Sequence, residues 1–148
     1  MAAMEAYEEA ARLLRANPKS DFVGPRDLEI IAAAEQRLGV RFPPSYCRFL
    51  LEFGCGNVGS QEIYGIVDNK LEQGPIPNAI WLNLQRQARG WRSTLFVIYE
   101  SGDGSSHALD LGHLDSENES AVWLLDVTGS PIEQAADNFG DFLLSLTR

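Results

Sequence analysis

The chain has few cysteines and no long hydrophobic run, and both facts exclude classes of protein. Cys47 and Cys55 lack the C-x-x-C spacing of a metal or redox pair, so in a reducing cytosol we expect two free thiols, at least one packed as a small apolar side chain. The longest apolar runs, 95–99 and 121–125, are far shorter than the roughly 20 residues of a membrane helix. The acidic N-terminus has no secretion-signal pattern. We therefore expect a cytoplasmic protein without a membrane partner.

The chain also lacks the common catalytic motifs. It contains no G-x-x-x-x-G-K-S/T phosphate loop, no H-E-x-x-H zinc motif and no G-x-S-x-G nucleophile turn. Gly54, Gly56 and Gly59 match the string G-x-G-x-x-G, but they follow a helical pattern and not a strand, so the context of a dinucleotide site is missing. We expect no catalytic residue, no metal ligand and no cofactor.

One short segment still invites comparison with a hydrolase, because Asp103, Ser105 and His107 lie within it. Neighbours in sequence do not make a catalytic triad, which needs a nucleophile, a base and an orienting group that converge in space. The sequence Gly102-Asp-Gly104 is typical of a turn, where these residues adopt positive φ and bond to the backbone. We predict a turn and keep a small hydrolase as the least favoured function.

Basic residues are nearly missing from residues 93–148. This segment holds ten acidic residues and one basic residue, Arg148, whereas residues 1–92 hold eleven of each, so it carries the whole formal net charge of −9. Such a charge repels nucleic acids and anionic lipids, and it attracts basic proteins and raises their association rate. The acids could instead form a solvated, solubilising face. We expect no nucleic-acid partner, and we expect a protein partner to have a basic surface.

The length and the order of the patterns predict one α+β domain over residues 1–148, with 1–26 as an N-terminal helical extension. Helical spacing of apolar residues occurs at 4–16, 25–38, 44–53, 79–89 and 139–146. Strand patterns occur at 62–67, 95–99, 107–111 and 121–127, with a hairpin turn at 102–104. These patterns predict a mostly antiparallel or mixed sheet flanked by N-terminal helices and a C-terminal helix. Gly54–Gly59 is expected to be a flexible loop.

The boundaries of the helices also carry signals. Pro25 suits the first turn of the second helix, Gly39 suits its left-handed C-terminal cap, and Asn78 suits the N-cap of the fourth helix. Asp137 or Asn138 is expected to cap the last helix.

Aromatic residues beside breaks and acidic residues in turns are the candidates for a binding surface. Tyrosine and tryptophan often anchor interfaces, because they bury a large area with few rotatable bonds. Core packing is the alternative for these aromatic residues. The turn at 102–104 and the acidic loop at 115–119 are expected to project side by side from the sheet, with solvated carboxylates facing the partner. The predicted partner-binding residues are Tyr64, Trp81, Trp91, Asp103, Asp115, Glu117 and Glu119.

Several motifs follow one another along the chain. They are Ile31-Ala-Ala-Ala-Glu-Gln-Arg-Leu-Gly39, Phe42-Pro-Pro-Ser-Tyr-Cys-Arg-Phe-Leu50, Gly54-Cys-Gly-Asn57, Tyr64-Gly-Ile66, Gly102-Asp-Gly104, Asp110 and Phe139-Gly-Asp-Phe-Leu143. In this order they resemble the SUKH superfamily of Smi/Knr type over roughly residues 27–146. The resemblance implies an α+β fold with a mixed sheet wrapped by helices, and no catalysis.

Many members of this superfamily are bacterial immunity proteins that bind and silence a toxin, and fungal relatives act in cell-wall signalling. The resemblance therefore implies a non-enzymatic immunity protein for a cognate toxin, such as a nuclease, with a basic surface. A regulatory scaffold that binds cellular partners is the alternative, since a fold alone does not fix a function.

Overall fold

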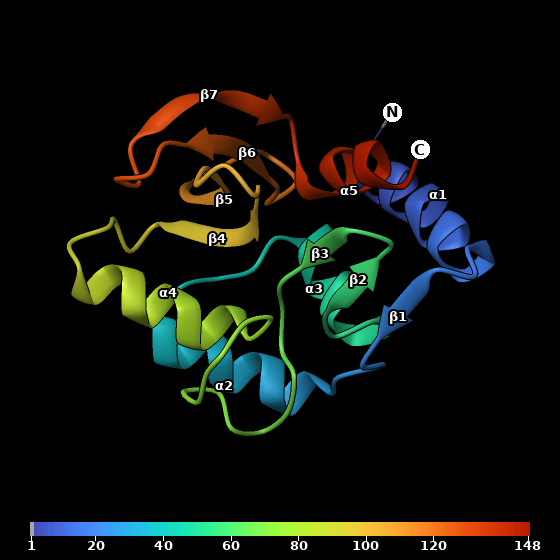
Figure 1. The fold of residues 1–148 in the computed structure, drawn as a ribbon, viewed down its shortest axis with the longest axis horizontal. Helices are drawn as coiled ribbons and strands as arrows, with labels where there is room; N and C mark the ends of the chain where they lie inside the picture. Colours follow the sequence, from blue (N-terminus) through green and yellow to red (C-terminus); the bar gives the residue numbers. More distant parts are fainter. Residues whose placement is uncertain (1) are drawn as a thin grey trace.

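Figure 1 shows the computed structural model of the protein, which describes residues 2–148. These residues form, in chain order, α1 (Ala3–Ala16), β1 (Ser20–Phe22), α2 (Leu28–Leu38), α3 (Pro44–Glu52), β2 (Gly56–Val58), β3 (Gln61–Ile63), α4 (Ala79–Ala88), β4 (Leu95–Glu100), β5 (Ser106–Leu114), β6 (Ser120–Leu125), β7 (Pro131–Ala136) and α5 (Phe139–Thr147). Each helix lies where a helical pattern predicts one. Helices combined with antiparallel sheets confirm the predicted α+β class.

The strands form two antiparallel sheets. One sheet has the order β1-β2-β3, and the other has the order β4-β5-β6-β7. In Figure 1 the larger sheet occupies the upper part, α4 and α2 lie below β4, and α1 and α5 pack side by side at the right. The main-chain N–H of Tyr64 donates to the carbonyl of Ile98 at 2.8 Å, so the end of β3 is joined to β4. The two sheets therefore contact each other directly.

Three strands lie where the sequence predicted none: β1, β2 and β7. The flexible loop predicted at Gly54–Gly59 is wrong in part, because β2 pairs there with both β1 and β3. Gly56 has a φ of +152°, and a Cβ added to it would lie 2.3 Å from the carbonyl oxygen of Asp21. Because glycine has no Cβ, β1 can approach closely at Gly56, and this close approach explains why the position is a glycine.

Side-chain caps begin three of the five helices that residues 2–148 form. Asp27 and Asn138 each accept a hydrogen bond from the first turn of α2 and α5, and Asn78 accepts two in α4. Gly39 adopts a φ of +69° directly after α2, as the sequence predicted. The placement of Pro25 inside α2 is wrong, since that helix begins after the Asp27 cap.

The core is built around aromatic side chains of α3 and α5. Tyr46, Phe49 and Phe139 are fully buried, and the rings of Tyr46 and Phe139 lie 5.0 Å apart in an edge-to-face arrangement. The hydroxyl of Tyr46 donates to the main-chain oxygen of Tyr64 at 2.9 Å, so this helix is also fastened to the end of β3. Removal of a large buried ring of this kind typically costs about 3–5 kcal/mol of stability.

The first helix lies against the last one. A Cβ added to Gly140 would lie 2.1 Å from the carbonyl oxygen of Ala3, so α1 and α5 approach at backbone distance. Tyr7 and Leu14 on α1 are buried in the same core as the rest of the chain, and the Tyr7 hydroxyl donates to Glu52 on α3 at 2.6 Å. Residues 3–22 thus pack against both α3 and α5 and supply β1.

Candidate protein-interaction surface

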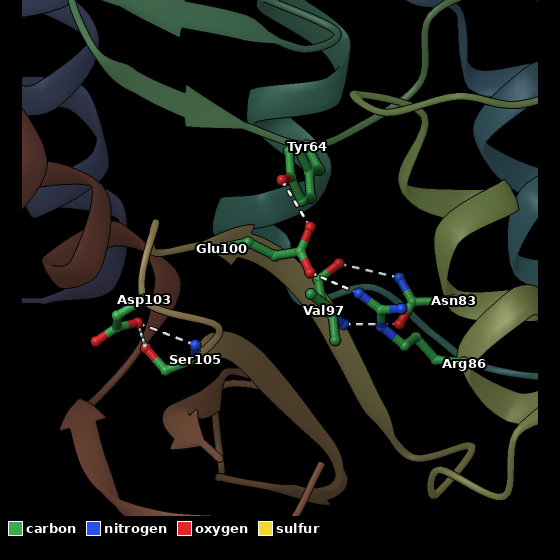
Figure 2. Close-up of polar contacts among 7 residues, drawn as sticks. All are labelled: Tyr64, Asn83, Arg86, Val97, Glu100, Asp103 and Ser105. Atoms are coloured by element: carbon green, nitrogen blue, oxygen red, sulfur yellow. Dashed lines mark hydrogen bonds and ion pairs between the residues drawn. The ribbon is translucent and has the colours of Figure 1, made fainter. Parts of the chain in front are cut away.

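A buried polar network surrounds Tyr64, for which the sequence suggested an exposed interface role. That exposure is wrong, because only 3% of Tyr64 is accessible. Its hydroxyl donates to Glu100 at 2.9 Å, and Arg86 donates to the second carboxylate oxygen of Glu100 at 2.6 Å (Figure 2). Burial, followed by the hydrogen bond to Glu100, raises the pKa of Tyr64. Both oxygens of Glu100 are engaged, so this cluster fastens β4 to its neighbours and holds no open catalytic base.

Asn83 completes the attachment of α4 to β4. Its side-chain amide donates to the carbonyl of Val97 at 2.9 Å and accepts from the N–H of Val97 at 2.7 Å, as Figure 2 shows. The side chain is almost completely buried and also donates to the carbonyl of Ala79. Asn83 therefore satisfies the same two groups of β4 that a neighbouring strand would satisfy. Together with the main chain of Tyr64, it closes the outer side of this strand.

Trp81 and Trp91 are half-buried and held against other parts of the chain. A Cβ added to Gly74 would lie 2.4 Å from the indole of Trp81, and one added to Gly129 would lie 2.4 Å from that of Trp91. The guanidinium of Arg86 also stacks 5.0 Å from the ring centroid of Trp91. Part of each ring is covered by other residues of the chain. No contact in the structure tests whether Trp81 and Trp91 bind a partner, so this role stays a prediction.

Asp103 forms the predicted hairpin turn. One carboxylate oxygen accepts from both the N–H and the hydroxyl of Ser105, at 3.0 and 2.6 Å (Figure 2), and these bonds lower the pKa of Asp103. His107 packs against the rings of both Tyr99 and Phe142, with centroids 5.4 and 5.1 Å away, and burial lowers its pKa. Its Nδ1 has no hydrogen-bond partner within residues 2–148. Because the Ser105 hydroxyl is bound to Asp103, the geometry does not support a triad.

Glu119 was predicted to be solvated, and this is wrong. It is 2% exposed, and its two carboxylate oxygens accept from the N–H and the hydroxyl of Ser45 at 2.8 and 2.7 Å. Ser45 lies in the first turn of α3, whose N-cap, Pro43, makes no side-chain cap. Glu119 therefore caps that helix from a distant part of the chain. Its burial raises its pKa, against the opposite effect of the two hydrogen bonds.

The turn at Asp103 and the acidic loop 115–119 were predicted to lie side by side, and this is also wrong. β5 begins at Ser106, directly after the turn, and ends at Leu114, directly before the loop. The two features therefore lie at opposite ends of one strand. A different neighbour is present at the turn: a Cβ added to Gly104 would lie 3.0 Å from Val127 in the connection between β6 and β7.

Five of the ten acids of the C-terminal segment are exposed. Among the predicted surface residues these are Asp103, Asp115 and Glu117, and Glu133 and Asp137 on or beside β7 join them. One oxygen of Asp115 accepts from the main chain of Glu117 and of Glu119, at 2.7 and 3.0 Å, so this carboxylate also shapes its loop. The exposed acids lie at both ends of the larger sheet and along its β7 edge.

Two adjoining hollows, which the sequence did not indicate, lie between the end of α2 and the second half of β5. Their volumes are about 600 and 390 Å³, and Arg41 and Leu114 line both. We call them together the α2–β5 groove; its apolar wall consists of Val40, Phe42, Pro44, Leu111 and Leu114. Leu114 is 40% exposed there, next to the acidic loop. The sequence signal was limited to Leu114, an apolar residue three positions past the predicted end of this strand at Leu111.

Neither thiol is placed for chemistry. Both cysteines are unpaired, and burial raises the pKa of Cys47 and, to about 12, that of Cys55. Over residues 2–148 no three His, Cys, Asp or Glu side chains are arranged to hold a metal ion. The same part of the chain contains no helix with the length and apolar character needed to cross a membrane.

Comparisons with known proteins agree with this architecture. The SUKH_6 family model, described as SMI1-KNR4 cell-wall, matches residues 28–143. Among solved structures, the chain is similar to a protein from Pseudomonas syringae pv. tomato, with 18% identity over 91% of this chain and 93% of that chain and a TM-score of 0.68. At this identity the likeness shows a common fold alone. No curated protein matches the chain.

Proposed function

The chain belongs to the SUKH family of SMI1-KNR4 type, and on this premise we propose that it is a non-enzymatic immunity protein that neutralises a bacterial toxin by binding it. The observation that carries the proposal is the acidic character of residues 93–148, which hold ten acids and one base and expose five of those acids. A basic toxin, such as a nuclease with a cationic active site, is the partner that this surface would attract. Neutralisation would take place in the cytoplasm, where nucleic acid is the toxin's target.

The arrangement of the acids supports binding over catalysis. Asp103 and Asp115 bond to the backbone of their own turns, and Glu100 and Glu119 are engaged by other side chains. A general acid or base needs a perturbed pKa together with access to a substrate. Glu119 is buried and both oxygens of the partly buried Glu100 are engaged, whereas the exposed carboxylates are suited to electrostatic attraction. The same charge would repel nucleic acids and anionic membranes, so the proposal excludes them as partners.

One observation favours a second candidate. The matching family model is described by the words cell-wall, which fits a regulatory scaffold that binds cellular proteins. Both candidates are binding functions without catalysis, and the identity of the partner separates them.

The deciding experiment is co-expression of this chain with the toxin encoded beside its gene. Rescue of growth together with a purified 1:1 complex would support the immunity function. Toxicity that persists while the chain is abundant and folded would overturn it.

The acidic surface can be tested with charge-neutral variants that keep the loop intact. Asp115→Asn with Glu117→Gln removes two charges but retains the oxygen that accepts from the loop backbone. We expect toxin association to slow by roughly three- to ten-fold, with a weaker dependence on salt. The matched control is Glu5→Gln with Glu8→Gln, two exposed acids on α1, which belongs to the segment 1–92 where acids and bases balance. Equal effects of the two pairs would show that these loop acids have no special role.

A further inference from the structure

The α2–β5 groove exists because β5 departs from its neighbour. Leu109 pairs with Val122, and the next pair joins Leu114 to Ser120, so β5 advances five residues where β6 advances two. The three extra residues form a large bulge, and Leu111 is held on the opposite side by a bond of 2.8 Å from its N–H to the carbonyl of Thr94. Bulges redirect side chains and are frequent beside functional sites. Here the bulge turns this part of β5 towards the end of α2.

The apolar wall of the groove is partly exposed to solvent, and charged residues lie near it. Leu114 keeps 40% of its surface exposed, and Leu111 and Val40 are only partly covered. Asp115 and Glu117 follow Leu114 directly and are exposed, and Asp110 precedes it. The lining itself holds one base, Arg41, and one acid, Glu35, so the excess of acids comes from the exposed Asp115 and Glu117, which follow Leu114 in the chain.

The exposed apolar wall and the acids beside it decide between the possible occupants of the α2–β5 groove. A second copy of the chain would bring its own acids against the same acids, which is unfavourable. An extended segment with positive charges beside an apolar side chain matches both the acidic border and the apolar wall. The larger hollow, of about 600 Å³, is open to solvent and has room for one leucine side chain.

We propose that the α2–β5 groove is the anchor site of a basic segment of the partner protein, with an apolar side chain of that segment packed against Leu114 and Leu111. This inference rests on the proposed function and specifies which part of the acidic surface makes the close contact. The loop acids attract the segment, and the groove retains it. The acidic turn at Asp103, at the other end of β5, then lies outside the close contact.

A defined peptide tests the groove without knowledge of the toxin. The probe is Gly-Lys-Lys-Leu-Lys-Lys-Gly, compared with the same peptide carrying serine in place of leucine. Both are titrated into ¹⁵N-labelled protein and followed by amide chemical shifts. We expect the largest shifts at Val40, Arg41 and residues 111–118, and about ten-fold tighter binding of the leucine peptide, because it buries one apolar side chain.

Two variants make the test specific. Leu114→Ser should lower the affinity for the leucine peptide about ten-fold, whereas Val127→Ser, which alters an exposed apolar residue (69% accessible) at the opposite end of the sheet, should not. Gln36→Trp should block the larger hollow from the side of α2. This second variant tests peptide binding in the groove even if Leu114→Ser fails to fold. Preserved amide dispersion checks that each variant is folded.

The possible outcomes separate the two proposals. Equal binding of the leucine and serine peptides, shifts centred on the turn at 126–130, or unchanged binding by both groove variants would overturn the groove assignment. Groove binding by the peptide without rescue in the co-expression experiment would leave the groove as a basic-segment site and reject the immunity function. Rescue that Leu114→Ser and Gln36→Trp leave unchanged would support the immunity function and reject the groove.

Discussion

Replacing Glu119 by alanine should destabilise the fold, although the sequence predicts that its loop is a solvated acidic segment. The substitution removes both acceptors from Ser45, whose N–H and hydroxyl are fully buried. Leaving a buried donor without a partner costs about 1–3 kcal/mol, and loss of a helix cap costs about 0.5–2 kcal/mol. The buried negative charge offsets part of this, as its raised pKa shows. We expect a net loss of about 2–4 kcal/mol.

The conservative variant should separate hydrogen bonding from charge. In Glu119→Gln, the amide oxygen can accept from the N–H of Ser45 and the amide nitrogen can donate to its hydroxyl oxygen. We expect this variant to lose less than about 1 kcal/mol. Urea unfolding followed by tryptophan fluorescence measures each free energy of unfolding. Glu117→Ala, an exposed neighbour, is the control and should stay within about 0.5 kcal/mol of the wild type.

The pH dependence gives a second readout with a definite sign. Because burial raises the pKa of Glu119, the folded state binds its proton more tightly than the unfolded chain does. The associated stability is complete below the ordinary pKa of 4.5 and is lost as the pH rises through the raised pKa of the folded state. The wild type should therefore gain stability relative to Glu119→Gln as the pH falls from 7 towards 4.5. An alanine variant as stable as the wild type would refute the capping role of Glu119.

Two further predictions follow from buried polar groups. Burial lowers the pKa of His107, so protonation of this side chain favours the unfolded chain. The stability of the wild type should therefore fall, relative to that of His107→Phe, as the pH drops below the ordinary pKa of 6.5. Melting temperatures of the two proteins that change in parallel with pH would contradict this prediction. Asn83→Ala leaves the N–H and carbonyl of Val97 without partners and should cost about 2–4 kcal/mol in urea unfolding, whereas Gln85→Ala on the exposed side of the same helix should be nearly neutral.

The helices could be predicted because each is specified by local residues. Gly39, Asn78 and Asn138 act within a few residues of their position, and the apolar spacing between such caps is itself a local signal. The glycines at 54–59 show the limit of this reasoning. Glycine in a turn and glycine where another strand approaches look alike in sequence, and only the pairing of β1 with β2 tells them apart.

The candidate surface was less predictable, because it depends on contacts between distant parts of the chain. Glu119 and Ser45 are separated by 74 positions, and no local pattern distinguishes this buried acid from the exposed Glu117 two residues before it. Tyr64 is covered for the same reason, since its partner Glu100 lies on another sheet. The charge asymmetry was visible in the sequence, and the strand predicted between the turn and the acidic loop already implied that the two, and their acids, are divided between its opposite ends.

That division implies two separable contributions to binding. Exposed charges act at long range and change mainly the association rate, which salt screens over a Debye length of about 10 Å at 0.1 M. An apolar side chain packed in the α2–β5 groove acts only at contact and changes mainly the dissociation rate. Asp115→Asn with Glu117→Gln should therefore alter the on-rate and its salt dependence, whereas Leu114→Ser should alter the off-rate. If both variants changed the same rate constant, steering and anchoring could not be assigned to different parts of this surface.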